Sequence, residues 1–145
     1  MNSASKAYGP LAFGVGSVRG LLKYTDSPVT VRFDGGESEQ MTITAFAVAN
    51  GQYFGGGMKV APDADPYDGK FAVTVWSGFG ASDFIFKQRM LRDGRHVELP
   101  GTKVRVCTTV EASSEKEVLI DCDGEQPGKL PCKMRVLPGA IRLAV

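Results

Sequence analysis

The sequence predicts an all-β protein, mainly an antiparallel β-sandwich, with one or two short helices. Three observations predict this fold class: short segments with apolar residues at every second position, turn residues between these segments, and only two stretches with helical spacing. Eighteen glycines and eight prolines supply the turns. The 145 residues suffice for one domain with a sizeable core and are few for two, so residues 1–145 are expected to form a single domain.

Period-two alternation marks the expected strands. Val29, Val31 and Phe33 alternate with polar neighbours directly after the turn residues at 25–28. Segment 41–49 (MTITAFAVA) begins with alternation and ends almost entirely apolar, as a buried strand does. The same reasoning predicts further short strands at 71–76, 103–112, 117–122, 132–136 and 140–145.

Two segments have helical spacing. The first is predicted over residues 10–24, where Leu11, Val15, Val18 and Leu22 recur at helical intervals, although glycines loosen it. The second is predicted over 82–92, with Ser82 or Asp83 as its N-terminal cap and Gly94 at its end. Its apolar residues could touch a lipid surface, but packing against the sandwich is favoured.

Composition excludes several classes of function. The net charge of +1 provides no strong field for nucleic acid or an acidic membrane, so no nucleic-acid partner is expected. No apolar run approaches the ~20 residues that span a bilayer, and the first residues do not resemble a signal peptide. The three cysteines include no C-x-x-C pair, which favours reduced thiols in a reducing, intracellular compartment over a disulfide framework or a zinc site.

An acidic, glycine-rich loop, GGGMKVAPDADPYDG, occupies residues 55–69. Its three glycines permit positive φ angles or a close backbone approach, and its prolines stiffen the chain that follows. Asp63, Asp65 and Asp68 offer the hard oxygens that Mg²⁺ or Ca²⁺ prefers, although the spacing is not that of an EF-hand. The alternative is a solvated turn whose aspartates cap backbone amides.

A second acidic turn lies at residues 121–131 (DCDGEQPGKLP). Asp123-Gly124 is a hairpin signal, and Glu125 follows it at the rim of a sheet. A carboxylate held there near a substrate hydroxyl could act as a general base, and the alternative is an exposed turn glutamate. His96, the only histidine, has no evident nucleophilic partner in the sequence and is expected at the surface.

Four segments in order carry a family resemblance: YGPLAFGVGSVRGLLKYTDSPVTVRFDG, VANGQYFGGGMKVAPDADPYDGKFAVTV, DFIFKQRMLRDGRHVELPGTKV and IDCDGEQPGKLPCKMRVLPGAIRLAV. Together they resemble the C-terminal β-sandwich domain of the diacylglycerol kinase-like lipid kinases, a group that includes sphingosine (long-chain base) kinases, ceramide kinases and bacterial YegS-type kinases. The resemblance covers nearly the whole chain. The segments around GGGMKVAPDADPYDG and KLPCKMRVLPGAI are most similar to plant long-chain-base-kinase-like members.

The resemblance implies roles for four residues. By analogy with bacterial members, the Asp68 side chain and the carbonyls of Asp65 and Lys70 would bind a structural Mg²⁺, beside the cleft between two domains. Glu125 would be the base that removes the proton from the lipid hydroxyl. These roles suit phosphoryl transfer, which depends mainly on positioning and charge neutralisation.

The resemblance also implies parts that these 145 residues do not contain. The family binds ATP mainly through an N-terminal α/β domain with a Gly-Gly-Asp-Gly-Thr loop, and neither that loop nor a G-x-x-x-x-G-K-[ST] motif occurs here. The chain is therefore expected to be the second domain of a two-domain lipid kinase, either a fragment or a truncated product, and to be inactive alone. A non-catalytic lipid-binding or regulatory module is the alternative.

The expected partners are the N-terminal kinase domain, a lipid substrate and, transiently, a membrane surface. The expected location is intracellular, either cytoplasmic or peripheral at a membrane.

Overall fold

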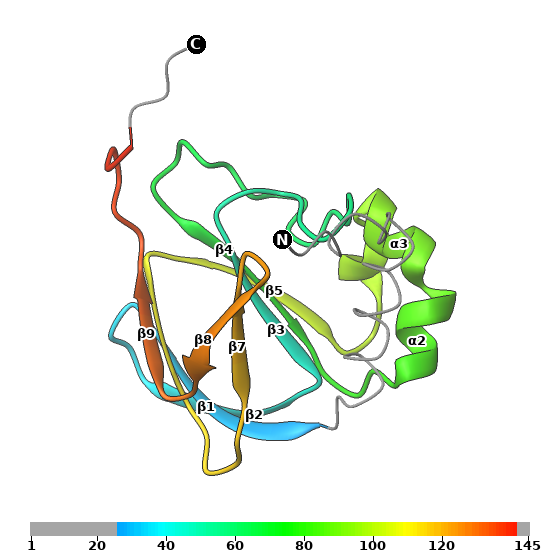
Figure 1. The fold of residues 1–145 in the computed structure, drawn as a ribbon, viewed down its shortest axis with the longest axis horizontal. Coiled ribbons are helices and arrows are strands. Elements are labelled where there is room, and N and C mark those ends of the chain that lie inside the picture. Colours follow the sequence, from blue (N-terminus) through cyan, green and yellow to red (C-terminus); the bar gives the residue numbers. More distant parts are fainter. Residues whose placement is uncertain (1–25, 142–145) are drawn as a thin grey trace, which may run out of the picture.

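Two antiparallel sheets and a separate hairpin make up the part of the chain described by a computed structural model, residues 26–141 (Figure 1). Sheet A has the strand order β2 (Ser38–Ile43), β1 (Ser27–Phe33), β6 (Thr109–Ser113) and β9 (Cys132–Arg135). Sheet B has the order β3 (Ala45–Ala49), β4 (Phe71–Trp76) and β5 (Thr102–Cys107). The hairpin consists of β7 (Leu119–Cys122) and β8 (Glu125–Lys129). The predicted all-β fold class is confirmed.

The main core lies between the two sheets, where the inward-facing residues of alternating strands meet. Buried members come from both sheets: Val29, Val31, Phe33, Ile43, Val73, Val75, Cys107, Val110 and Ala112. Because strand side chains alternate between faces, the period-two pattern of the sequence correctly indicated most of these positions.

A second cluster lies on the opposite face of sheet B, under the helices. It contains Val60, Ala61, Ala64, Trp76, Phe79 and Leu91. Strand β3 turns its alanines to this side and Phe46 and Val48 to the main core. Strands β3 and β4 thus pack on both faces, which explains why segment 45–49 is apolar throughout, whereas the edge strand β5 is mostly exposed.

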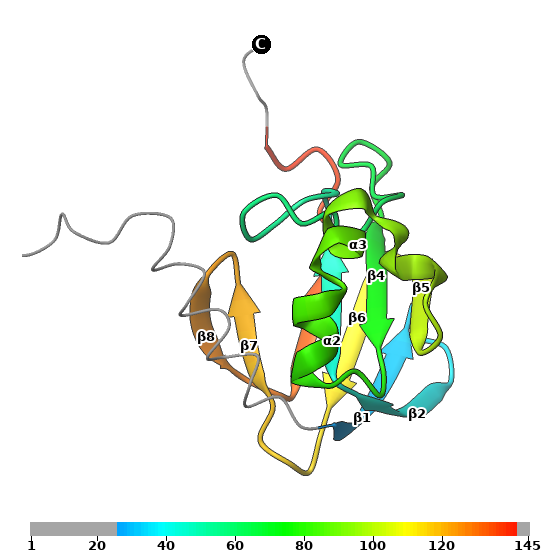
Figure 2. The same ribbon diagram turned by 90° about the vertical axis from the view of Figure 1, so that its right-hand side faces the viewer.

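The helices α2 (Ala81–Phe86) and α3 (Gln88–Asp93) and the 3₁₀ turn η1 (Arg95–Glu98) cover sheet B (Figure 2). The single helix predicted over 82–92 is instead a pair that is interrupted at Lys87, whose φ of −95° and ψ of 8° are not helical. The Lys87 amide still donates to the Asp83 carbonyl at 2.8 Å, so the interruption is a kink.

The predicted C-terminal end of this helical segment is confirmed, whereas the N-cap is Gly80 in place of Ser82 or Asp83, and Asp83 lies in the first turn. The Asp83 carboxylate accepts a hydrogen bond from the Gly80 amide at 2.8 Å, at the start of α2. Gly94 ends α3 with a φ of +77°. The helix predicted over residues 10–24 lies outside the described residues.

Two predicted strands, 41–49 and 103–112, are each two strands that belong to different sheets. The first breaks at Thr44, whose hydroxyl donates to Asp26 and accepts from the Phe79 amide. The second breaks at Thr108, whose amide and hydroxyl both donate to one oxygen of Asp34 at 2.7 Å. At both corners the threonine keeps a backbone hydrogen bond, to Trp76 or from Val136, and its hydroxyl adds a side-chain bond, so the chain crosses from one sheet to the other without a loop.

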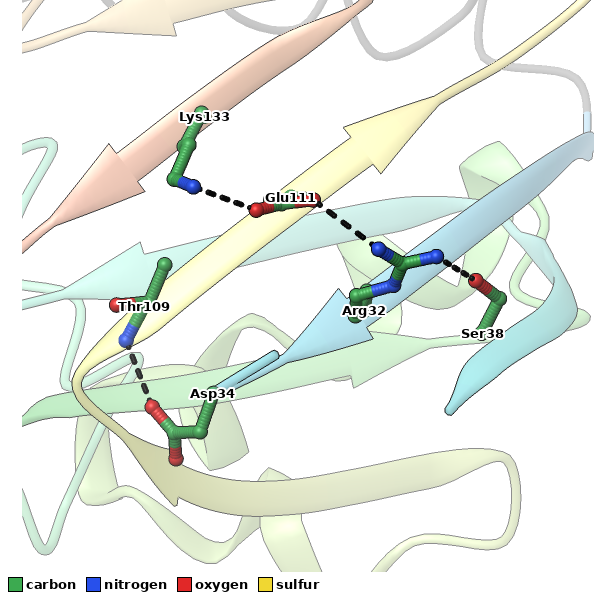
Figure 3. Close-up of polar contacts among 6 residues, drawn as sticks. All are labelled: Arg32, Asp34, Ser38, Thr109, Glu111 and Lys133. Carbon is green, nitrogen blue, oxygen red and sulfur yellow. Dashed lines mark hydrogen bonds and ion pairs between the residues drawn. The ribbon is translucent and has the colours of Figure 1, made fainter. Parts of the chain in front are cut away.

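Polar side chains cover the outer face of sheet A, as Figure 3 shows. Glu111 contacts Lys133 at 2.7 Å and Arg32 at 3.8 Å, and Arg32 also donates to Ser38 at 3.1 Å. These contacts follow the strand register from β2 to β9. This face is therefore suited to solvent, in contrast to strands β3 and β4 of sheet B, which pack on both faces.

The strands near the C-terminus agree in part with the predictions. Strands β7 and β9 fall within the predicted segments 117–122 and 132–136. In the predicted strand 140–145, Ala140 and Ile141 lie in no strand, and the other residues are outside the described part.

Candidate functional site

The loop between β3 and β4 begins with a glycine turn. Phe54 and Met58 exchange two backbone hydrogen bonds of 3.0 Å around Gly55, Gly56 and Gly57. All three glycines have positive φ angles, of 52°, 78° and 91°. The conformational freedom predicted for the glycine run is therefore used, because other residues rarely adopt such angles.

The chain then enters a buried segment before it reaches the aspartates. Val60, Ala61 and Ala64 are 2%, 2% and 5% exposed and pack in the cluster beside the helices. The Ala64 amide donates to the Ala61 carbonyl at 3.0 Å, which closes a tight turn. The acidic turn that follows thus projects from a buried base.

Asp65, Asp68 and Lys70, the residues that the family resemblance assigns to Mg²⁺, lie in one exposed turn. The Asp68 amide donates to the Asp65 carbonyl at 3.3 Å. Each aspartate also caps a backbone amide: Asp65 Oδ1 accepts from Tyr67 at 2.9 Å, and Asp68 Oδ1 accepts from Lys70 at 2.8 Å. The two aspartates thus cap backbone amides, as the alternative interpretation predicted. Each uses its Oδ1 for this bond, so the other carboxylate oxygen of each residue can still accept a bond or bind a cation.

The donor set of this turn fits a hard divalent cation. Asp63, Asp65 and Asp68 are exposed, and no ion pair within the described residues neutralises them. Among residues 26–141 no three His, Cys, Asp or Glu side chains form a potential metal cluster. The predicted set is of a different kind, with one carboxylate and two carbonyls, and Mg²⁺ commonly combines so few protein ligands with water.

Glu125 lies on a different element, the β7–β8 hairpin. Asp123 and Gly124 have φ angles of +52° and +90°, the positive values of a two-residue hairpin turn, so the predicted turn is confirmed. The Asp121 carboxylate accepts from the Gly124 amide at 3.0 Å and braces the turn. Glu125 pairs with Cys122 directly after this turn and is exposed.

The hairpin turn and the β3–β4 loop lie at the same end of the molecule. Both are in the upper half of Figure 1 and of Figure 2, which shows the same structure turned by 90°. Gly69, in the acidic turn, also lies beside Pro138, which follows β9; an added Cβ would be 3.4 Å from the Pro138 ring. Segments distant in sequence therefore gather at this end.

The prediction that His96 lies at the surface is wrong. Its side chain is 1% exposed, and its Nε2 lies 3.2 Å from the Val60 carbonyl. Its ring is tilted against that of Trp76, with 5.5 Å between ring centroids. The 3₁₀ turn after Gly94 carries it inward, under the loop that holds the aspartates. The sequence signal was its place between the apolar Leu91 and Leu99.

Burial lowers the pKa of His96, because the charged imidazolium loses its hydration. The nearby carbonyls of Val60 and Met90 oppose this shift. No hydrogen bond of acceptable geometry reaches Nδ1 within the described part of the chain. The neutral ring donates to the Val60 carbonyl only in the tautomer that carries its proton on Nε2.

Comparison with known proteins places this fold and these turns in a family. The chain matches the family profile described as "YegS C-terminal NAD kinase beta sandwich-like domain" over residues 1–145. It is 26% identical over 141 residues to the "Probable lipid kinase YegS-like" of Stenotrophomonas maltophilia (strain K279a), covering 95% of this chain and 45% of that protein. It is 25% identical over 123 residues to the "Diacylglycerol kinase" of Staphylococcus carnosus (strain TM300), covering 85% and 40%.

A solved structure agrees in fold. The crystal structure of a diacylglycerol kinase from Bacillus anthracis str. Sterne superposes with a TM-score of 0.66 at 22% identity, covering 90% of this chain and 44% of that one. The chain belongs to the YegS C-terminal β-sandwich family, the C-terminal domain of the diacylglycerol kinase-like lipid kinases. It spans less than half the length of the curated relatives that it matches.

In the described segment, no helix has the length and apolar character needed to cross a bilayer.

Proposed function

We propose that this chain is the C-terminal half of an ATP-dependent lipid kinase that transfers the γ-phosphate to a lipid hydroxyl. The observation that carries the proposal is the family match over residues 1–145, whose relatives include proteins named lipid kinase and diacylglycerol kinase. The acceptor is a diacylglycerol or a sphingoid base. The resemblance to plant long-chain-base-kinase-like members stays a prediction.

The nucleotide site belongs to an N-terminal domain of the same protein. Two facts support this division: the chain spans 45% of its lipid-kinase relative, and its 145 residues contain no Gly-Gly-Asp-Gly-Thr loop. The isolated chain is then inactive, and catalysis requires the two halves to meet at the end where the acidic turn and the β7–β8 turn lie.

Glu125 is the proposed base. Its exposed carboxylate, directly after a braced two-residue turn, takes the proton as the lipid O–H bond breaks. The lipid oxygen forms a bond to the γ-phosphorus, and the bond from that phosphorus to the bridging oxygen of ATP breaks, which releases ADP. Both turn residues with positive φ keep the carboxylate at the tip of the hairpin.

The acidic turn is the proposed Mg²⁺ site. The Asp68 carboxylate and the carbonyls of Asp65 and Lys70 would hold the ion. Bound there, Mg²⁺ would supply a fixed positive charge that rigidifies the turn beside the interdomain cleft. The chain's own hydrogen bonds already bring these three residues into one turn, at 2.8 Å and 3.3 Å.

A kinase assay on the full-length gene product tests the proposal. The protein is offered ATP, Mg²⁺ and vesicles that contain diacylglycerol, a sphingoid base or ceramide, and phosphorylated lipid is measured. The proposal predicts product from diacylglycerol or a sphingoid base and none from the 145-residue chain alone. Failure with every lipid would contradict it.

A non-catalytic lipid-binding or regulatory module is the second candidate, because the nucleotide-binding motifs are missing from these 145 residues. The genomic sequence upstream of Met1 separates the two candidates. A reading frame that encodes Gly-Gly-Asp-Gly-Thr about one domain-length earlier supports the kinase, and a promoter and start codon at Met1 support the module.

A further inference from the structure

The Val60 carbonyl, at the buried base of the acidic loop, accepts two side-chain hydrogen bonds. Thr74 Oγ1, on β4, donates at 2.8 Å, and His96 Nε2, on η1, lies at 3.2 Å. Both donor residues are 1% exposed, and Val60 is 2% exposed. Two buried donors from separate elements thus converge on one oxygen.

His96 also packs against the Trp76 ring and lies near the Met90 carbonyl, and the hydrogen bond that its geometry gives is the one to Val60. Its Nδ1 and the Trp76 indole nitrogen have no hydrogen-bond partner within residues 26–141. The two residues line a cavity of about 10 Å³, room for one water at most. Because a buried imidazole loses hydration, an apolar side chain would pack there at lower cost unless the Nε2–H donor is needed.

The path from Val60 to the aspartates is short and partly buried, and one side of it borders an open cavity of about 190 Å³ that Thr74 also lines. Ala61 and Ala64 are buried on either side of Pro62. Gly94 lies so close that an added Cβ would be 2.9 Å from the Pro62 ring and 3.1 Å from the Lys59 side chain. Four residues separate Val60 from Asp65, and two of them are buried, so the position of the Val60 carbonyl constrains where the acidic turn begins.

We propose that His96 and Thr74 are positioning residues for the acidic turn: their hydrogen bonds to the Val60 carbonyl fix the point from which Asp65 and Asp68 project, and so determine the affinity for Mg²⁺. This inference rests on the Mg²⁺ site of the proposed function. It assigns His96 the role of a neutral Nε2–H donor, separate from any contact with substrate or metal.

MgCl₂ titration of the 145-residue chain tests the inference with two readouts, the thermal midpoint and the fluorescence of Trp76. Trp76 is the only tryptophan and lies 5.5 Å from the His96 ring, so its emission reports on this packing. His96→Phe keeps a ring and removes the donor, and we expect Mg²⁺ affinity to fall about 10-fold, the usual scale for loss of a group that orients metal ligands. His96→Gln retains an amide donor near the Nε2 position and should recover most of the affinity.

Thr74 provides the matched pair on the other donor. Thr74→Val keeps the shape and removes the hydroxyl, and should weaken Mg²⁺ binding in the same direction; Thr74→Ser should not. Val31→Ala, in the core between the sheets, is the control for general destabilisation and should leave the affinity unchanged. If His96→Phe fails to fold, the Mg²⁺ affinities of Thr74→Val, Thr74→Ser and His96→Gln test the inference.

The outcomes separate the two claims. A Mg²⁺ response that is lost in Asp68→Ala but unchanged in His96→Phe and Thr74→Val overturns the positioning role and leaves the metal site standing. No response in the unaltered chain contradicts the metal site and overturns the inference with it. Equal weakening by Val31→Ala would show that only overall stability matters, which also overturns the inference.

Discussion

At the residue scale, the aspartates of the β3–β4 loop are not equivalent. Asp68 and Asp65 cap amides within one turn, whereas Asp63 lies earlier, beside the buried base of the loop. If the turn binds Mg²⁺ as proposed, one carboxylate should dominate. A merely acidic patch would respond to any of the three.

Asp68→Ala should abolish the stabilisation of the chain by millimolar Mg²⁺, because it removes the only side-chain ligand of the proposed site. Asp63→Ala should change it little and serves as the matched control. The measurement is the thermal midpoint with and without MgCl₂. Equal losses from the two substitutions would indicate a diffuse acidic surface.

His96 makes the stability of the chain depend on pH. Because burial lowers its pKa in the folded chain below the ordinary value of 6.5, the unfolded chain binds a proton at a higher pH than the folded chain does. His96 therefore contributes full stability above about pH 6.5, and this contribution is lost as the pH falls below that value.

Urea unfolding between pH 7.5 and 5 measures this effect. The free energy of unfolding should decrease with decreasing pH in the unaltered chain and stay nearly flat in His96→Gln. No other histidine exists to confuse the assignment, and Asp34 and Asp83, whose pKa values are lowered by hydrogen bonds, titrate at lower pH. The same slope in both proteins would show that His96 titrates normally.

At the element scale, glycines with positive φ differ in what surrounds them. Gly94 ends α3 at +77° against Pro62, while Gly56, at +78° in the glycine turn, has no neighbour within 4 Å of an added Cβ. An alanine at Gly56 would meet backbone strain alone, and an alanine at Gly94 would meet the same strain and a steric clash, so the two substitutions measure these effects separately.

Gly56→Ala should destabilise the chain by about 1–2 kcal/mol, the cost of a left-handed alanine. Gly94→Ala adds a clash at 2.9 Å and should cost about 1–3 kcal/mol more, the usual range for overpacking. Urea midpoints at constant m-value measure both. Equal losses of unfolding free energy in the two variants would show that Pro62 and Lys59 move away from the new methyl group at little cost.

The elements also show how far sequence reasoning reaches. Alternation predicted most strands and the main core, because one face of each strand is buried. It missed the breaks at Thr44 and Thr108, since a corner changes which sheet a strand joins without interrupting its hydrophobic pattern. Asp26 and Asp34, which complete these corners, are distant in sequence.

The candidate site was predictable to a similar extent. Glycine and Asp-Gly signals located both turns, because positive φ angles require those residue types. The positions of the two turns at one end, and the burial of His96 against a carbonyl 36 residues away, follow from tertiary packing alone. The roles of Asp65, Asp68, Lys70 and Glu125 came from the family resemblance and remain predictions.

At the scale of the whole molecule, sheet A turns a polar outer face to solvent, while the loops and the β7–β8 turn gather at one end (Figures 1 and 2). The proposed kinase function places the contact with an N-terminal domain at this end. The proposed role of Glu125 belongs to this scale, because proton transfer from the lipid to Glu125 would need the lipid and ATP bound together.

Phosphoryl transfer by the full-length protein with Glu125→Gln tests the central claim most directly, because glutamine keeps the shape of the side chain and removes the basic oxygen. The account predicts that kcat for lipid phosphorylation falls by roughly 100-fold or more, the scale of a positioned base, while the KM for ATP and the thermal midpoint stay unchanged. Asp123→Asn is the control and should cost less, since asparagine tolerates the positive φ of 52° at this turn position. A near-normal kcat in Glu125→Gln would contradict the claim that this domain supplies the base.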